Sequence, residues 1–463
     1  MIESFRNIFA IPELRKRVLF TFGLLAVYRI GCAIPTPGID PAALLAFMNA
    51  QADSFLGFIN TFTGGSLRRI AIFSLGIMPY ITASIILQLL TVVWPYLEKL
   101  SKEGELGRKK ITQYTRYGTV VISIIQGSGI AFYLEKMTSP GGLPLVPAGR
   151  AGWGFVTMTV ITLTTGTAFV MWLGEQISER GIGNGISLII FAGIVVGFVP
   201  AIVNTVNGLQ RGNLDLLKIV PLVIFMVAVV AFIVYMERAQ RRIPIQYAKR
   251  VVGRKVYGGQ STYLPLRVNT GGVIPVIFAG SVVTIPTVLA SMAPNSQWVQ
   301  ETANYIKYGQ PIYYLLQTVA IVFFSYFYIS IIFNPSDVAD NMRKYGGFIP
   351  GIRPGKRTAE YIDRILTRIT LVGSLYLAAV CLLPEFLLTG FHIAGIPWLG
   401  PRLDQYFPDW FKEGMGINFY FGGTSLLIVV GVAMDTIQQV ESQLVMRNYE
   451  GFMKRSRIRG RRG

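Results

Sequence analysis

The sequence predicts an all-α polytopic membrane protein in which ten transmembrane helices form two sets of five. Of its 463 residues, 52% are hydrophobic and only 14% are charged, whereas soluble proteins carry about 25% charged residues. The mean hydropathy is +0.49. The net charge of +19 is high for so apolar a chain, so basic residues must concentrate outside the membrane. Ten long apolar runs, separated by polar segments, complete the case.

Each of these runs is long enough to cross a membrane, because a bilayer core of about 30 Å needs roughly 20 apolar residues in a helix. The first run is short, and Pro384 lies near the end of the ninth. The runs lie near residues 18–34, 70–94, 117–137, 152–173, 184–205, 216–236, 271–292, 312–333, 366–388 and 418–438.

Lysine and arginine in the connecting segments predict the orientation of the spans. They concentrate in the leader, in the loops after spans two, six and eight, and in the tail, while the alternate loops carry few. Since cytoplasmic loops are enriched in these residues, both termini are expected in the cytoplasm. We find no cleavable signal before the first span, because no small-residue cleavage site follows a short apolar region.

The spans divide into an N-terminal half, 1–205, and a C-terminal half, 206–440, followed by a basic tail, 441–463. Long cytosolic loops are expected over about 237–270 and 334–365. An odd number of spans per half reverses the orientation of the second half, as in an inverted repeat around a midplane pathway. Pro79 and Pro275 occupy corresponding places, but ten unrelated spans would explain the pattern equally well.

Residues 53–69, DSFLGFINTFTGGSLRR, do not have the composition of an ordinary loop. The segment is apolar and aromatic, too short to span the bilayer, and broken by Gly64 and Gly65. It could be a short helix folded back into the protein or an interfacial cap on the outer surface. Hydropathy does not separate these two interpretations.

The sequence offers no catalytic, metal-binding or cofactor-binding constellation. It has one histidine, His392, and two cysteines, Cys32 and Cys381, both inside apolar runs. No phosphate-binding GK[ST] motif is present. Ionisable residues such as Arg29 and Asp435 are rare in the spans and lie near their ends, where an arginine is usually structural. A non-enzymatic membrane protein is expected. A secondary transporter would need a midplane coupling site, and a structural scaffold remains a second alternative.

Several blocks of sequence resemble the SecY family, the counterpart of the eukaryotic Sec translocon alpha subunit. They lie across both halves and are closest to bacterial members: IFSLGIMPYITASIILQLLTVVWP (72–95), GRKKITQYTRYGT (107–119), MWLGEQISERGIGNGISLIIFAGIV (171–195), ERAQRRIPIQYAKR (237–250), QSTYLPLRVNTGGVIPVIFA (260–279), FNPSDVADNMRKYGGFIPGIRPGKRTAEYID (333–363) and FYFGGTSLLIVV (419–430). The resemblance implies two halves closed like a clamshell around an hourglass pore. It also implies passage of polypeptides across the membrane or sideways into it. The long outer loop, 389–417, and the Arg-rich tail depart from the family pattern.

The resemblance implies a ring of aliphatic side chains at the waist of the pore. By motif, the ring consists of Ile77, Ile81, Ile186, Ile190, Ile277 and Ile428. Within each of the first two pairs the i, i+4 spacing places both side chains on one helix face. Bulky apolar side chains at a narrow point exclude water and ions. Without the motif, packing between helices or contact with lipid would explain such isoleucines better.

The same resemblance assigns a plug over about 55–69 and a lateral gate between spans two and three and spans seven and eight. The plug would comprise Phe55, Leu56, Phe58, Ile59, Phe62, Gly64 and Gly65, and the gate Thr82, Gln88, Gln126 and Ile285. Pro79, Pro275 and Pro286 could kink the gate helices. The glutamines could equally form interhelical hydrogen bonds that only hold the bundle.

The basic loops resemble the docking surface for cytosolic partners, with Arg254, Lys255, Arg353, Arg357 and Tyr449 at the matching positions. Clustered lysine and arginine attract RNA phosphates and acidic protein surfaces, although most such residues only follow the positive-inside rule. The implied partners are SecE, SecG, the SecA motor ATPase, the ribosome with its nascent chain, signal sequences, SecDF, YidC and anionic phospholipids. The expected location is a bacterial inner membrane, with a thylakoid homologue as the alternative.

Overall fold

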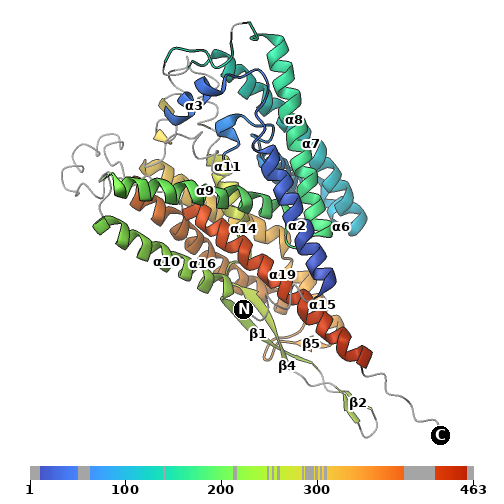
Figure 1. Ribbon diagram of the computed structural model, residues 1–463. Coiled ribbons are helices and arrows are strands. Elements are labelled where there is room, and N and C mark those ends of the chain that lie inside the picture. Colours follow the sequence, from blue (N-terminus) through green and yellow to red (C-terminus); the bar gives the residue numbers. More distant parts are fainter. Residues whose placement is uncertain are drawn as a thin grey trace. The chain divides into compact units, whose positions relative to one another are not determined.

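The computed structural model (Figure 1) forms two compact units, Met1–Asn204 with Val432–Gly463 and Thr205–Gly431. The residues described are 11–50, 63–138, 141–147, 149–211, 216–247, 250–252, 255–257, 261–283, 310–390 and 423–455, with isolated positions between 286 and 306. The divisions between the units fall inside two helices, α9 (Gly185–Gln210) and α19 (Gly423–Arg455).

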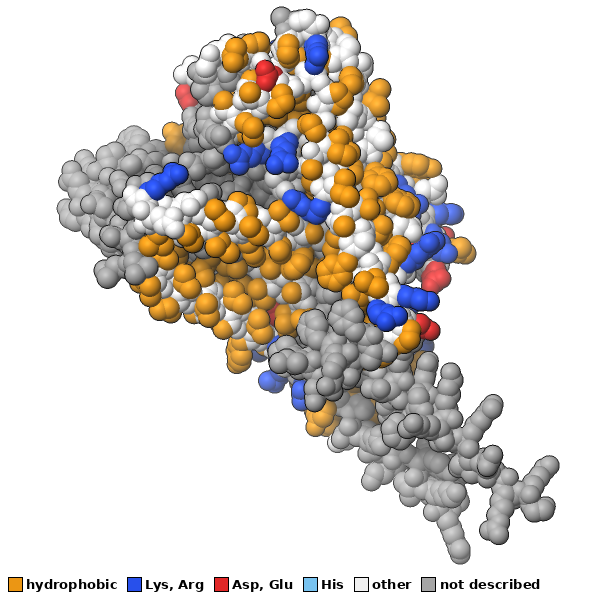
Figure 2. Space-filling model, in the orientation of Figure 1, with side chains coloured by type: hydrophobic (Ala, Val, Ile, Leu, Met, Phe, Trp, Pro, Cys, Tyr) orange, Lys and Arg blue, Asp and Glu red, His pale blue; other side chains and the backbone are white. Residues whose placement is uncertain are grey.

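The predicted all-α membrane fold is confirmed for the described part of the chain. Seven helices there are long and apolar enough to cross a bilayer, or eight if α5 (Met78–Val93) and α6 (Pro95–Lys102), which meet at 99°, form one span. Figure 2 shows hydrophobic side chains over most of the described helical surface that faces the viewer. The seven spans include α7 (Glu105–Lys136), α8 (Trp153–Arg180), α9, α10 (Leu216–Arg238), α14 (Pro311–Ile332), α16 (Lys356–Thr389) and α19. Helix α2 (Pro12–Gly31) is a further long helix outside these seven.

The second span begins later than the sequence predicted. Residues 70–77 form turns, and α5 begins only at Met78. Ile70 and Gly76 have φ values of +43° and +56°, which a right-handed helix cannot contain. Pro79 then fits the first turn of α5, where its missing N–H costs nothing.

Two of the three prolines that could kink gate helices instead lie in the first turns of their helices. Pro79 is the second residue of α5, and Pro275 is the second residue of α11 (Ile274–Val283). Neither lies in a helix interior, where a proline would bend the axis. Their matching places therefore mark matching helix starts, and Pro286 lies beyond the end of α11.

In the first unit, α8 lies against α2, α5 and α7. Glycines allow close approach of the backbones: a Cβ on Gly166 of α8 would lie 1.9 Å from the Ile72 carbonyl oxygen. At the exposed end of this packing, Arg116 of α7 pairs with Glu175 of α8 at 2.8 Å. A short helix, α3 (Pro41–Ala50), and a 3₁₀ turn, η1 (Leu67–Arg69), pack beside this bundle around the buried Leu44, Phe47 and Ile70.

In the second unit, α14 packs between α11 and α16. The loop after α10 forms a β-hairpin, which the sequence analysis did not predict. Strands β1 (Gln240–Tyr247) and β4 (Ser261–Arg267) pair antiparallel, and β5 (Gly347–Phe348) joins the other edge of β1. Strands β2 (Arg250–Val252) and β3 (Lys255–Tyr257) form a second, two-stranded sheet.

The hairpin encloses a small core of its own with α15 (Pro335–Lys344) and the start of α16. Ile243, Ile245, Leu266, Met342 and Ile362 are buried together there. Along β1, Arg242 and Pro244 are exposed while Ile243 and Ile245 are buried, the alternation of a strand with one covered face. This core positions the loop that carries Arg353.

Candidate functional site

In the first unit the four predicted ring isoleucines lie at the starts of two helices. Ile77 caps α5, and its carbonyl accepts a hydrogen bond from the Ile81 N–H at 3.1 Å. Ile186 and Ile190 lie in the first two turns of α9. Ile77, Ile81 and Ile190 are buried and Ile186 is half-buried. The two isoleucines of each pair thus lie about one helical turn apart, the first pair at the start of α5 and the second at the start of α9.

Local hydrogen bonds fix the start of α9 and therefore the direction of its isoleucines. The Asn184 side-chain oxygen accepts from the Ile186 N–H at 3.1 Å, and the Ser178 hydroxyl accepts from the Gly185 N–H at 2.9 Å. A Cβ on Gly185 would lie 2.0 Å from the Gly174 carbonyl oxygen. Asparagine is a favoured helix N-cap, and glycine is required next to it by the closeness of α8.

In the second unit, Ile277 and Ile428 also lie in helices. Ile277 is half-buried on α11, and Ile428 is fully buried on α19. A Cβ on Gly431, one turn after Ile428, would lie 2.7 Å from a methyl group of Val273, just before α11. These two helices therefore approach closely beside both isoleucines. Closure of all six side chains into one ring stays a prediction.

The predicted plug is described only at its C-terminal end. Phe55, Leu56, Phe58, Ile59 and Phe62 lie outside the described residues. Gly64 and Gly65 have φ values of +66° and +82°, a conformation that glycine adopts without steric cost. Leu67–Arg69 follow as one turn of 3₁₀ helix.

The described gate residues lie on α5 and α7. The Thr82 hydroxyl donates to the Met78 carbonyl at 3.0 Å, and the Gln88 amide donates to the Ser84 hydroxyl at 3.1 Å. Both bonds run within α5, and neither links Gln88 to another helix. The Gln88 oxygen is buried with no partner among the described residues. Gln126 is half-buried on α7, and Ile285 lies outside the described part.

The docking residues that the structure describes lie at the start of α16 and around it. Arg353 and Arg357 are exposed, and the Thr358 hydroxyl donates to the Arg353 carbonyl at 3.0 Å. This bond ties the loop to the first turn of α16, so the arginine projects from a fixed backbone. Lys255 begins β3 and Tyr449 lies in α19, where only the backbone is described, while Arg254 lies outside the described residues.

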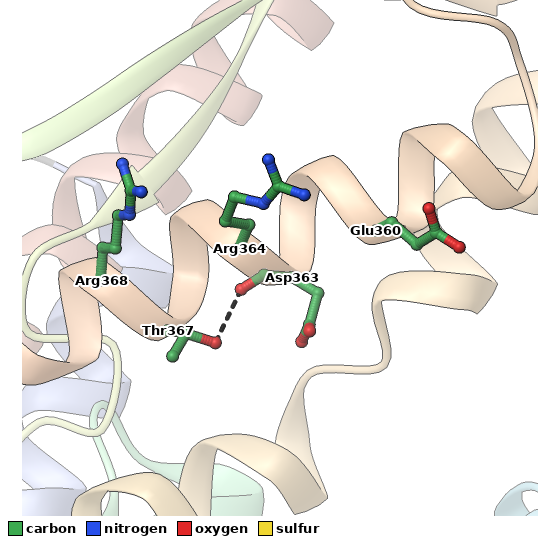
Figure 3. Close-up of a pocket in the computed structure, with 5 residues that line it drawn as sticks. All are labelled: Glu360, Asp363, Arg364, Thr367 and Arg368. Atoms are coloured by element: carbon green, nitrogen blue, oxygen red, sulfur yellow. Dashed lines mark hydrogen bonds between the residues drawn. The ribbon is translucent and has the colours of Figure 1, made fainter.

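A shallow pocket of about 440 Å³ lies on the first turns of α16 (Figure 3). Figure 3 shows Arg364 and Arg368 pointing one way and Glu360 and Asp363 another. The Thr367 hydroxyl donates to the Asp363 carbonyl at 2.9 Å, which is an ordinary bond within a helix. With one helix lining it and both signs of charge, the pocket has no feature of a catalytic site.

Among the described residues no group of three or more histidine, cysteine, aspartate or glutamate side chains could hold a metal ion. Cys32 and Cys381 are buried, free thiols. The described candidate residues offer apolar packing at helix starts and exposed arginines at and just before the start of α16.

Sequence reasoning missed the contact of Arg29 with the turn at Gly64. The Arg29 Nη1 donates to the Gly64 carbonyl at 2.9 Å, across 35 residues of sequence. An arginine in an apolar span together with a Gly-Gly pair was visible in the sequence. Nothing local, however, relates residues so far apart.

Known proteins resemble the chain over nearly its whole length. The family model of SecY matches residues 71–437. The protein translocase subunit SecY of Escherichia coli K12 is 48% identical over 97% of this chain and 96% of its own. That of Thermus thermophilus is 44% identical over the full length of both.

Solved structures share the fold at low identity. A structure described as a protein conducting channel superposes with a TM-score of 0.61 at 18% identity, over 93% of this chain and 92% of its own. Sec61 from a canine ribosome–channel complex gives a TM-score of 0.57 at 19% identity, with the same coverage. These similarities show the fold of the chain.

Proposed function

We propose which residues of this chain, which belongs to the SecY family, seal the channel, which open it and which bind its partners. The family match over residues 71–437 and the 48% identity over nearly the full chain carry this conclusion. The chain is a channel subunit of the translocase that conducts polypeptides. The comparisons give the secondary-transporter alternative no support.

The proposed waist of the channel consists of Ile77, Ile81, Ile186, Ile190, Ile277 and Ile428. Its support is that all six are aliphatic and lie at helix caps or in helices, four of them buried. A narrow apolar constriction gates by dewetting, since ions do not leave their hydration shells for it. Isoleucine also offers no hydrogen bond or charge that would retain a passing side chain. The ring would therefore seal around many sequences and bind none.

The proposed plug and lateral gate close the resting channel. In a related protein, the plug domain of SecY is described as stabilising the closed state and maintaining a membrane seal. We assign the same role to residues 55–69. A signal sequence would part the gate at Thr82, Gln88, Gln126 and Ile285, where polar contacts on α5 are breakable. The plug would then leave the waist.

Partners supply the energy for transport in this proposal. Sec61 and Ssh1 occur in structures of ribosome complexes, and the exposed Arg353 and Arg357 fit acidic or RNA surfaces. We propose docking of the ribosome or the SecA motor at these residues together with Arg254, Lys255 and Tyr449. SecE and SecG would complete the channel, with SecDF, YidC and anionic phospholipids as further partners. The protein would lie in a bacterial inner membrane with both termini cytoplasmic.

Protection of a secretory precursor from protease tests this function. The chain is reconstituted into vesicles with SecE and SecG, and SecA, ATP and precursor are added. We expect ATP-dependent protection that disappears when the vesicles are dissolved with detergent. Absence of protected precursor with every partner combination, ribosomes included, would contradict the proposal.

The Arg353→Glu variant tests the docking surface. We expect loss of most SecA-driven protection, because charge reversal repels an acidic partner surface. Since Arg353 is exposed on a loop that backbone contacts hold, the folded channel and its resting conductance should not change. Arg343→Glu, which alters an arginine in the last turn of the neighbouring helix α15, is the matched control. Equal loss in both variants would remove the special role of Arg353.

A further inference from the structure

Arg29 makes a hydrogen bond that its position at the end of a helix does not by itself require. It occupies the last turn of α2, near the end of the first span, and is half-buried. A cation there is already favoured by the helix dipole. Its Nη1 nevertheless donates to the Gly64 carbonyl at 2.9 Å. Because the donor is charged, this bond is stronger than a neutral one.

The turn at Gly64 is enclosed between Arg29 and α9. A Cβ on Gly64 would lie 2.7 Å from Arg29 Nη1 and 2.9 Å from Gly193 Cα, and the φ of Gly64 is +66°. Any other residue would be strained here and would also push these neighbours apart. Glycine therefore allows the turn to contact both α2 and α9.

The same turn touches the two segments of the first unit that carry ring isoleucines. Gly193 follows Ile190 by three residues and Ile186 by seven, so all three share one face of α9. A Cβ on Gly76, the residue before Ile77, would lie 3.3 Å from the Thr63 methyl carbon. Thr63 and Gly64 thus contact both segments immediately beside the proposed ring.

The rest of this segment is held without Arg29. The Ser66 hydroxyl is placed to donate to the carbonyls of Thr63 and Phe73, at 2.8 and 3.2 Å. The Ile72 N–H donates to the Ile34 carbonyl at 3.0 Å. Loss of the Arg29 side chain would leave these contacts in place and remove the bond that holds Gly64.

We propose that Arg29 is a positioning residue of the resting channel: it holds the Thr63–Gly64 turn against α9 and against the link into Ile77, and so keeps the first half of the ring closed. The inference rests on the proposed ring. Without the guanidinium the turn would separate from α9, and Ile77 and Ile190 would lose their common support. Ions would then pass through the resting channel.

Ionic current through the purified complex in planar bilayers, without precursor, tests the role of Arg29. We expect about a tenfold higher resting conductance in Arg29→Gln, since loss of a charged hydrogen bond shifts an equilibrium by at least that factor. Arg29→Lys keeps a charged donor and should restore part of the seal. Arg15→Gln, which removes an exposed arginine of the same helix α2, should conduct like wild type. Wild-type conductance in Arg29→Gln would overturn the proposal.

A second set of variants separates positioning from general instability. Gly64→Ala should raise conductance as Arg29→Gln does, and the double variant should conduct no more than the leakier single one. In a background with Cys32 and Cys381 replaced by alanine, a Thr63→Cys thiol, at a side-chain position that is 1% exposed, should react faster with a water-soluble maleimide when Arg29 is glutamine. Additive conductances, or unchanged labelling, would contradict the role of Arg29. Precursor protection by the wild type tests the channel function independently, so failure of either proposal can be recognised.

Discussion

Arginine side chains have opposite surroundings at the segment 63–77 and on the hairpin β1–β4. At the segment, glycines allow close contact between backbones, and Arg29 of α2 donates a hydrogen bond to the Gly64 carbonyl. In the hairpin, a small aliphatic core lies under strands whose arginines face outward. The difference separates an arginine that bonds to backbone within the first unit from arginines that are exposed on the hairpin.

Gly166→Ala should have the largest effect on this comparison. Its Cβ would lie 1.9 Å from the Ile72 carbonyl oxygen, so α8 and the segment must separate. We expect a loss of about 3 kcal/mol of stability, measured as a lower melting temperature of the purified complex. Gly154→Ala, on the same helix with open space around it, should change little. Equal melting temperatures for both variants would show that the segment is not close-packed.

Ile243→Ala should have the next largest effect, confined to the hairpin. Ile243 is 2% exposed, and removal of such a side chain costs about 2–4 kcal/mol. We expect faster hydrogen exchange in 240–267 with unchanged exchange in α8. Tyr263→Ala, which removes a side chain that is 58% exposed, is the control. Faster exchange in α8 as well would mean that the hairpin is not an independent core.

Arg241→Gln should have the smallest effect. Its side chain is exposed on β1, and such substitutions change stability by about 0.5 kcal/mol or less. Melting temperature and resting conductance should both equal the wild type, in contrast to Arg29→Gln. A conductance increase in Arg241→Gln would remove the distinction between inward and outward arginines.

The sequence predicted the membrane fold well because hydropathy integrates over some 20 residues at a time. It placed the start of the second span too early, because the positive φ angles of Ile70 and Gly76 interrupt the helix inside an apolar run. It missed the hairpin, since the alternation around Ile243 and Ile245 is short and lies among charged residues.

The candidate site was predictable only in part. The isoleucines of the proposed ring were assigned by motif, and their closure into one ring stays a prediction. The contact of Arg29 with Gly64 joins residues 35 positions apart, and no periodicity records such a pair. The close contact of Gly64 with Gly193 arises only when the turn packs against α9, so neither sequence segment alone predicts it.

Resting conductance of the Ile81→Ser, Ile190→Ser double variant tests the central claim most directly. Both side chains are buried at helix starts, and hydroxyls at an apolar waist would let water and ions enter. The matched control is the pair Ile86→Ser and Val199→Ser, on the same two helices, where the side chains are 44% and 66% exposed. We predict a large ion current in the first variant and the wild-type current in the control. Wild-type current in both, or equal leak in both, would contradict a seal formed by the isoleucine ring.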